Sequence, residues 1–130
     1  RFRSYSNLLK VSFNNDAYLA NRATLQNSSD IPTLIISGYY NASSLSNLQI
    51  KEGATLISST TPILNGYLFS TSLDLSVLTK ASTYYNLVFA NGTEIWADDF
   101  PSSDLTATLE NSGKTYRLAK INSKVVIYYE

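Results

Sequence analysis

The sequence predicts an all-β domain folded as an antiparallel β-sandwich. Short runs of alternating apolar and polar residues are separated by Gly, Asn, Ser and Pro, which is typical of half-buried strands. About ten such runs recur at spacings of roughly 8–12 residues, as they do in sandwiches and barrels. No segment keeps an apolar stripe of helical period over three turns, so a helical fold is not indicated.

The first half of the chain is expected to be built from short strands joined by turns. In the run from 17 to 26, Leu19, Ala23 and Leu25 are expected on one face. Glu52 and Gly53 form a candidate hairpin turn, because Gly readily adopts the positive φ of tight turns. The expected strands of this half are residues 5–13, 17–26, 34–36, 47–51 and 54–58.

A change of pattern marks a corner after the next strand. Asn65 and Gly66 indicate a turn, and residues 67–73 then alternate regularly. The alternation stops there, so the strand is expected to end in one short helical turn, with Asp74 or Ser76 capping its backbone N–H groups. Three leucines are expected to pack this corner: Leu73, Leu75 and Leu78.

The rest of the chain is expected to form one more central strand, a hairpin and three closing strands. In residues 84–89, Tyr85, Leu87 and Phe89 form one face. Asn91 and Gly92 are the strongest hairpin signal and lead into a strand at 93–97. The closing strands are expected at residues 105–110, 115–120 and 125–129.

These elements are expected to form a single domain over residues 1–130. Its sandwich core is placed at about residues 31–97, with strands 105–129 forming an appended C-terminal β-hairpin beyond a seam at 98–103. The chain has no Met and begins with Arg1, so it is expected to be a piece of a larger polypeptide. The side chains predicted to fill the core are Leu34, Ile36, Phe69, Leu73, Leu87 and Phe89.

Composition argues against several classes of function. Lys plus Arg and Asp plus Glu number ten each and are scattered, so neither a nucleic-acid site nor charge-driven membrane binding is indicated. No apolar stretch is long enough for membrane insertion. The chain has no Cys and no His, which excludes disulfides and thiolate metal sites and leaves any Ser nucleophile without its usual base. We therefore expect no enzymatic activity.

The polar surface is built mostly from uncharged groups. Charged residues make up only 15% of the chain, against an average of about 25% in globular domains, and Ser, Thr and Asn take their place. This composition is common in secreted and cell-surface β-domains, so an extracellular or cell-surface location is expected. Asn27, Asn41 and Asn91 begin sequons for N-glycosylation, although a chain so rich in Asn, Ser and Thr contains such triplets by chance.

The middle and the end of the chain carry a resemblance to a known family. The segments are Gly66-Tyr67-Leu68-Phe69, Leu73-Asp74-Leu75-Ser76, Tyr84-Tyr85-Asn86-Leu87-Val88-Phe89 and Asn91-Gly92. Together they resemble immunoglobulin-like accessory modules of bacterial extracellular and glycan-handling proteins. The strand Thr115-Tyr116-Arg117-Leu118 and the hairpin after it are similar to the ends of β-sandwich domains appended to some cell-wall glycosyltransferases. The resemblance implies an immunoglobulin-like sandwich, and it carries no ligand residues with it.

The acidic residues allow two interpretations. Asp98 and Asp99 are neighbours, and neighbouring side chains of a strand point to opposite faces, so they make a poor catalytic pair. With Asp104 they can instead contribute oxygens to a Ca²⁺ ion, which takes several hard ligands from a flexible loop. The spacing matches no defined calcium loop, and a solvated loop before Pro101 explains the same residues.

The aromatic residues carry the main functional hint. The chain contains ten Tyr and one Trp, and flat rings stack on the apolar faces of sugars while Asn, Ser and Thr bond to sugar hydroxyls. Trp96 is the first candidate, followed by Tyr39, Tyr40 and Tyr84. The alternative is structural, because Tyr favours strands and a Trp in a sandwich commonly fills the core. In each adjacent Tyr pair, one ring is expected to point inward and the other outward.

Two functions follow from these observations. The first is a non-catalytic carbohydrate-binding or substrate-targeting module of a larger cell-surface or secreted protein, with a glycan or a cell-surface protein as its partner. The second is an architectural module, which serves as a spacer, adhesion unit or oligomerisation domain and binds no small ligand. Three or more coplanar exposed rings on one face would favour the first, and one continuous apolar patch of roughly several hundred Å² would favour a protein interface and hence the second.

Overall fold

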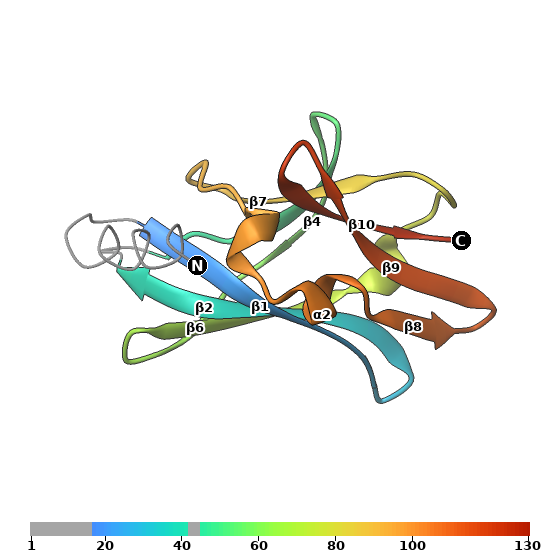
Figure 1. The fold of residues 1–130 in the computed structure, drawn as a ribbon, viewed down its shortest axis with the longest axis horizontal. Helices are drawn as coiled ribbons and strands as arrows, with labels where there is room; N and C mark the ends of the chain where they lie inside the picture. Colours follow the sequence, from blue (N-terminus) through green and yellow to red (C-terminus); the bar gives the residue numbers. More distant parts are fainter. Residues whose placement is uncertain (1–16, 42–44) are drawn as a thin grey trace.

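The structure is a computed structural model, which describes residues 17–41 and 45–130. It is all-β, with two antiparallel sheets that pack around a shared core (Figure 1). This confirms the predicted fold class and the two-sheet arrangement. The strand expected at residues 5–13 lies outside the described residues.

The smaller sheet has four strands and the larger has six. From edge to edge, the smaller sheet runs β1 (Ala17–Ser28), β2 (Ile31–Asn41), β6 (Leu68–Asp74) and β5 (Ile63–Asn65). The larger sheet runs β4 (Thr55–Thr60), β3 (Leu48–Glu52), β7 (Tyr85–Phe89), β10 (Lys124–Tyr129), β9 (Lys114–Ile121) and β8 (Thr108–Asn111). The short helical segments are η1 (Leu75–Val77), η2 (Ala97–Asp99) and α2 (Ser102–Leu105). Among the described residues, no helix has the length and apolar character needed to cross a membrane.

The core lies between the sheets and contains every side chain that the alternation placed there. Leu34, Ile36, Phe69, Leu73, Leu87 and Phe89 are all buried in one cluster. Rings from both sheets meet in this cluster. Tyr18 of the smaller sheet stacks on Phe89 of the larger one at 4.4 Å between centroids, and Phe69 meets both rings edge-on. The prediction of these core residues is confirmed.

The predicted corner after β6 is present. η1 follows directly on β6, and Asp74 is its N-cap residue. One carboxylate oxygen of Asp74 accepts hydrogen bonds from the backbone N–H of Ser76 at 2.8 Å and from the Ser76 hydroxyl at 2.6 Å. Leu75 and Leu78 are fully buried beneath the turn. Cap and packing therefore form as the loss of alternation indicated.

A bulge in β1 changes which of its side chains face the core. The register with β2 shifts at Asn21, which is an extra residue on β1. Tyr18 faces the core before the bulge, whereas Ala23 and Leu25 face it afterwards. An extra residue reverses the alternation of faces. The prediction that Leu19 shares a face with Ala23 and Leu25 is therefore wrong, because the bulge lies between them.

Gly38 makes the bulge sterically allowed. It pairs with Ala20 at the point where the register shifts. A Cβ atom at this position would collide with the backbone carbonyl of Leu19. Any other residue would force the two strands apart, so β2 needs Gly here for close approach of the backbones.

The closing strands belong to the larger sheet. β10 pairs with β7, and β9 and β8 follow outward (Figure 1). Their inward side chains join the common core: Tyr116, Leu118, Val125, Ile127 and Tyr129. The core thus extends beyond residues 31–97, and the closing strands complete the sandwich rather than being appended to it. The strand expected at 105–110 begins at Thr108, because residues 102–105 form α2.

Removing the ring of Phe89 tests the packing between the sheets. Phe89→Ala is expected to lower the free energy of unfolding by about 3–5 kcal/mol, because it removes a buried aromatic ring and leaves a cavity. Chemical denaturation followed by circular dichroism measures the change. Leu45→Ala, at an exposed position, is the control and should change stability by less than about 0.5 kcal/mol. Similar losses for the two variants would contradict this account of the core.

Removing the cap tests the corner. Asp74→Ala is expected to destabilise the protein by about 1 kcal/mol, because the Ser76 N–H loses its acceptor. Asp74→Asn keeps a capping oxygen and should retain most of the stability. Equal melting midpoints for wild type and Asp74→Ala would show that the cap contributes nothing.

Candidate functional site

Trp96 lies on the outer face of the larger sheet. The segment before η2 joins this sheet through two isolated bridges, Val88 to Glu94 and Trp96 to Lys124, where a full strand was predicted. Ile95 and Ala97 are buried on either side of Trp96, so alternation turns the indole outward, where it is only half-buried. The Lys124 ammonium lies 5.6 Å from the centroid of the indole ring. It also lies 3.4 Å from a carboxylate oxygen of Glu94.

Tyr84 and Tyr128 form a pair on the same outer face. Tyr84 precedes the buried Tyr85, and Tyr128 lies between the buried Ile127 and Tyr129, so both rings point away from the core. Their centroids are 5.2 Å apart at an interplanar angle of 85°. Tyr128 is a site residue that sequence reasoning did not select, although the alternation of residues 125–129 could have identified it.

Trp96 and the Tyr pair lie on one outer face of the larger sheet, which we call the outer platform and define by Trp96, Tyr84, Tyr128 and Asn86. On β10, Val126 lies midway between Lys124 and Tyr128. Lys124 pairs with Trp96, and Val126 pairs with Asn86 of β7. Four residues of extended strand separate the ends of the platform by about 13 Å. The centre holds the exposed Asn86 above the buried Val126, with Lys51 of β3 paired to Asn86 beside it, and the aromatic rings lie at the two ends.

A polar side chain borders the Tyr end of the platform. Arg117 of β9 pairs with Tyr128, and its side chain is 39% exposed. Its Nε atom lies 3.7 Å from a carboxylate oxygen of Glu130, and no hydrogen-bond partner for this atom is found among the described residues. The guanidinium places hydrogen-bond donors beside an aromatic pair.

Tyr39 and Tyr40 do not join Trp96. Both belong to β2 in the smaller sheet. The Tyr40 ring lies 6.0 Å from that of Tyr18, nearly parallel to it, and packs against the core. Tyr39 points outward and lines a groove of about 660 Å³ on the smaller sheet. In this pair, as in the pair of Tyr84 and Tyr85, one ring faces inward and one outward, as predicted.

The three candidate metal ligands are held in separate contacts. Asp98 pairs with Lys120 at 3.1 Å, while Asp99 is buried at the end of η2. Asp104 accepts hydrogen bonds from Arg22 Nε at 2.9 Å and from the backbone N–H of Ala23 at 3.0 Å. Across residues 17–41 and 45–130, no group of three or more carboxylate, His or Cys side chains is arranged to hold a metal ion. The acidic residues are therefore not gathered as a Ca²⁺ site requires.

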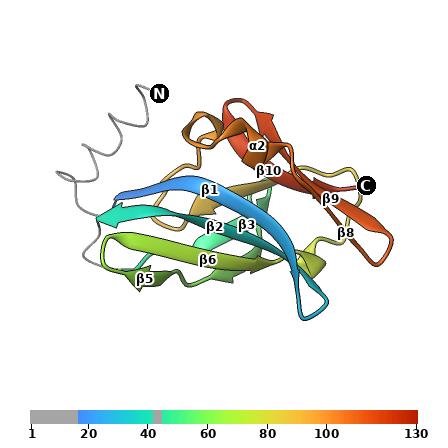
Figure 2. The same cartoon turned by 60° about the horizontal axis from the view of Figure 1, so that its bottom comes forward.

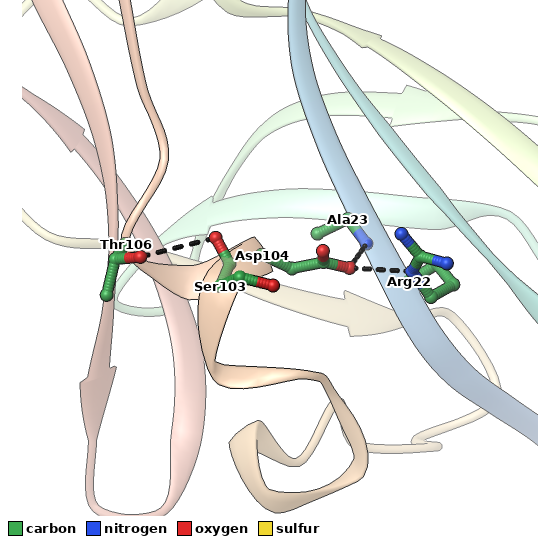
Figure 3. A network of polar contacts seen from close by, with 5 residues as sticks. All are labelled: Arg22, Ala23, Ser103, Asp104 and Thr106. Atoms are coloured by element: carbon green, nitrogen blue, oxygen red, sulfur yellow. Dashed lines mark hydrogen bonds and ion pairs between the residues drawn. The ribbon is translucent and has the colours of Figure 1, made fainter.

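Asp104 instead stabilises the bulge in β1. Figure 3 shows its carboxylate reaching from α2 to the edge of β1, where it accepts hydrogen bonds from the Arg22 side chain and from the backbone N–H of Ala23, just beyond the extra residue. The carboxylate raises the pKa of the Arg22 guanidinium, first through the hydrogen bond and then through its charge. Asp98, Lys120 and Arg22 line a groove of about 800 Å³ beside this contact. Each of these three charges is already paired, so the groove is bounded by structural ion pairs.

Comparison with protein-family models, curated proteins and solved structures found no significant match for this chain.

Replacing Asp104 tests its support of β1. Asp104→Ala is expected to cost about 1–3 kcal/mol of stability, because the half-buried N–H of Ala23 loses its acceptor. Asp104→Asn keeps an oxygen for that N–H and should cost less. Arg22→Ala leaves that acceptor in place and removes an ion pair in which Arg22 is 62% exposed and Asp104 only 10% exposed, so it should lower the melting midpoint less than Asp104→Ala does. If Arg22→Ala destabilised as much as Asp104→Ala, the ion pair rather than the backbone contact would be the important interaction.

Proposed function

We propose that this protein is a non-catalytic carbohydrate-binding module that holds a neutral glycan on the outer platform. The observation that carries the proposal is that Trp96, Tyr84 and Tyr128 share one face of the larger sheet, at the two ends of a centre formed by Asn86. Aromatic rings stack on the apolar faces of sugars. Rigid strands hold them at a constant separation, which favours binding of an extended chain.

The polar groups around the rings fit the same ligand. Asn86 lies at the centre of the platform and offers both donors and acceptors. Arg117 adds donors at the Tyr end, and Lys124 adds an ammonium at the Trp end. Sugar hydroxyls can bond to each of these groups. Glu94 and Glu130 lie near Lys124 and Arg117 and offset these two cations. Lys51 beside Asn86 adds one further charge, and a single charge suits a neutral glycan better than a polyanion.

The strand order supports a more specific fold for the module. One sheet runs β1-β2-β6-β5, and the larger sheet contains β4-β3-β7-β10. These orders correspond to the A-B-E-D and C′-C-F-G sheets of immunoglobulin-like domains. We assign the module to that architecture, with β9 and β8 extending the second sheet beyond the G position. Accessory modules of this kind belong to larger bacterial proteins, and a place in a secreted or cell-surface parent follows from the proposal.

Affinity electrophoresis through soluble glycans, together with pull-down on insoluble ones, tests the binding. A subset of neutral glycans is expected to retard the protein, and Trp96→Ala should weaken the retardation at least about fivefold, since a stacked ring contributes about 1 kcal/mol. Tyr84→Ala should act in the same direction. Tyr39→Ala removes a ring that is also exposed but lies on the other sheet, and it should bind a short soluble oligosaccharide, which needs only one platform, like wild type.

Salt provides a second readout of the same interaction. Binding of a neutral glycan releases no counterions, so raising NaCl from about 0.05 to about 0.5 M should change the affinity less than about twofold. A glycan that binds equally well to wild type and to folded Trp96→Ala would show that the platform is not the site. If no glycan retards the protein, the architectural module is the function to retain.

A further inference from the structure

One long stretch of the chain carries no charge. From Gly53 to Leu73 the sequence contains no Asp, Glu, Lys or Arg. This stretch includes all of β4 and β5, which are edge strands of the two sheets, and most of β6. Only Thr61 and Pro62 separate β4 from β5, so the two edges meet on the same side of the molecule.

Exposed apolar side chains gather in this uncharged stretch. They are Leu56, Ile63, Leu64, Tyr67 and Leu68. Ile63 is 73% exposed and Tyr67 is 80% exposed, more than any other large apolar side chain among the described residues. Tyr39 pairs with Leu68 and adds its ring to the same surface, next to the groove of about 660 Å³. Strand pairing places Tyr39, Leu68 and Ile63 on the same outward face of the smaller sheet. A group of exposed apolar side chains on one face marks a protein contact, whereas single exposed side chains do not.

Of the four sheet edges among the described residues, β5 is the one without a charge, a bulge or a covering segment. α2 and Asp104 cover β1, and β8 contains Glu110, whose carbonyl accepts a hydrogen bond from Asn27 of β1. In β4 the register shifts opposite Ile50 and Lys51, which places a bulge at Ile57. All residues of β5 are exposed and uncharged, and their register with β6 is regular. Figure 2 shows the strand at the edge of the smaller sheet. Natural proteins protect edges with charges, bulges, covering segments, Pro or very short strands. Among the described residues β5 has only the last two, because it is three residues long and follows Pro62, so its exposed side chains rather than a long backbone edge are what a partner would cover.

We propose that two copies of this chain associate through β5 and the turn that joins it to β6, around a two-fold axis. An antiparallel edge pairs with its own copy under such symmetry, so the same surface serves both partners. The lack of charge favours this occupant, because no like charges meet across the axis and a charged partner would find no counterpart. Ile63, Tyr67 and Leu68 would bury their exposed surface against the second copy. β5 belongs to the smaller sheet, and the outer platform lies on the larger one, so the dimer leaves both platforms open.

Sedimentation velocity over protein concentrations from about 1 to about 200 µM, a range that covers dissociation constants of weak and moderate interfaces, tests the proposal. The wild-type chain is expected to shift from its monomer mass of 14.4 kDa to a dimer as concentration rises. Ile63→Lys places two like charges across the axis and should raise the dissociation constant at least about tenfold. Its position is exposed in the monomer, so the variant should fold normally.

Ile121→Lys is the matched control. Ile121 is an exposed isoleucine at the turn between β9 and β10, away from β5, and this variant should dimerise like wild type. A wild-type chain that stays monomeric at the highest concentration overturns the proposal, as does an equal effect of the two Lys variants. Hydrogen exchange gives an independent check, since the amides of residues 63–65 should exchange more slowly as the dimer forms. None of these results depends on whether a glycan binds.

Discussion

The contact on which the rest of the structure depends is the stacking of Tyr18 on Phe89 across the two sheets. Their ring centroids are 4.4 Å apart, and Phe69 closes the cluster edge-on. The Tyr18 hydroxyl also accepts a hydrogen bond from the backbone N–H of Ser46 at 3.0 Å, which ties the start of β3 to the same ring. Once these inner faces are packed, every residue of opposite parity must point outward. The outward positions of Trp96, Tyr84 and Tyr128 are thus a consequence of the core.

The two sides of the sandwich differ in the side chains that they expose and pair. On the side of β1 and β8, polar side chains join the sheets. Asp104 holds the bulge, and Asn111 Nδ2 donates to Asn27 Oδ1 at 2.8 Å and to the carbonyl of Asp30 at 3.0 Å. On the side of β4 and β5, the chain is uncharged and apolar side chains are exposed. Buried polar groups need partners within the chain, whereas exposed apolar groups gain from a partner outside it.

The two proposed surfaces complement each other because they lie on different sheets. A single aromatic platform binds its glycan weakly, since each ring that stacks on a sugar contributes only about 1 kcal/mol. A dimer through β5 would present two platforms on one particle. On a polymeric glycan, the second platform would then bind at a high effective concentration, and the overall avidity would exceed that of one site. The arrangement gives a physical reason why a module of this size would carry both surfaces.

The sequence by itself determined the features that depend on local alternation. It identified the six core side chains from Leu34 to Phe89 and the corner capped by Asp74, because period-two placement and capping are set by neighbouring residues. Only the tertiary structure decided the rest. The bulge at Asn21 has no local signal in the sequence. It is held by Asp104, which accepts a hydrogen bond from the backbone N–H of Ala23, 81 residues away along the chain. Tyr39 and Trp96 lie on different sheets, whereas Tyr128 lies beside Tyr84. Strand order decides both, and it is set by pairing between distant segments, which alternation along one strand does not encode.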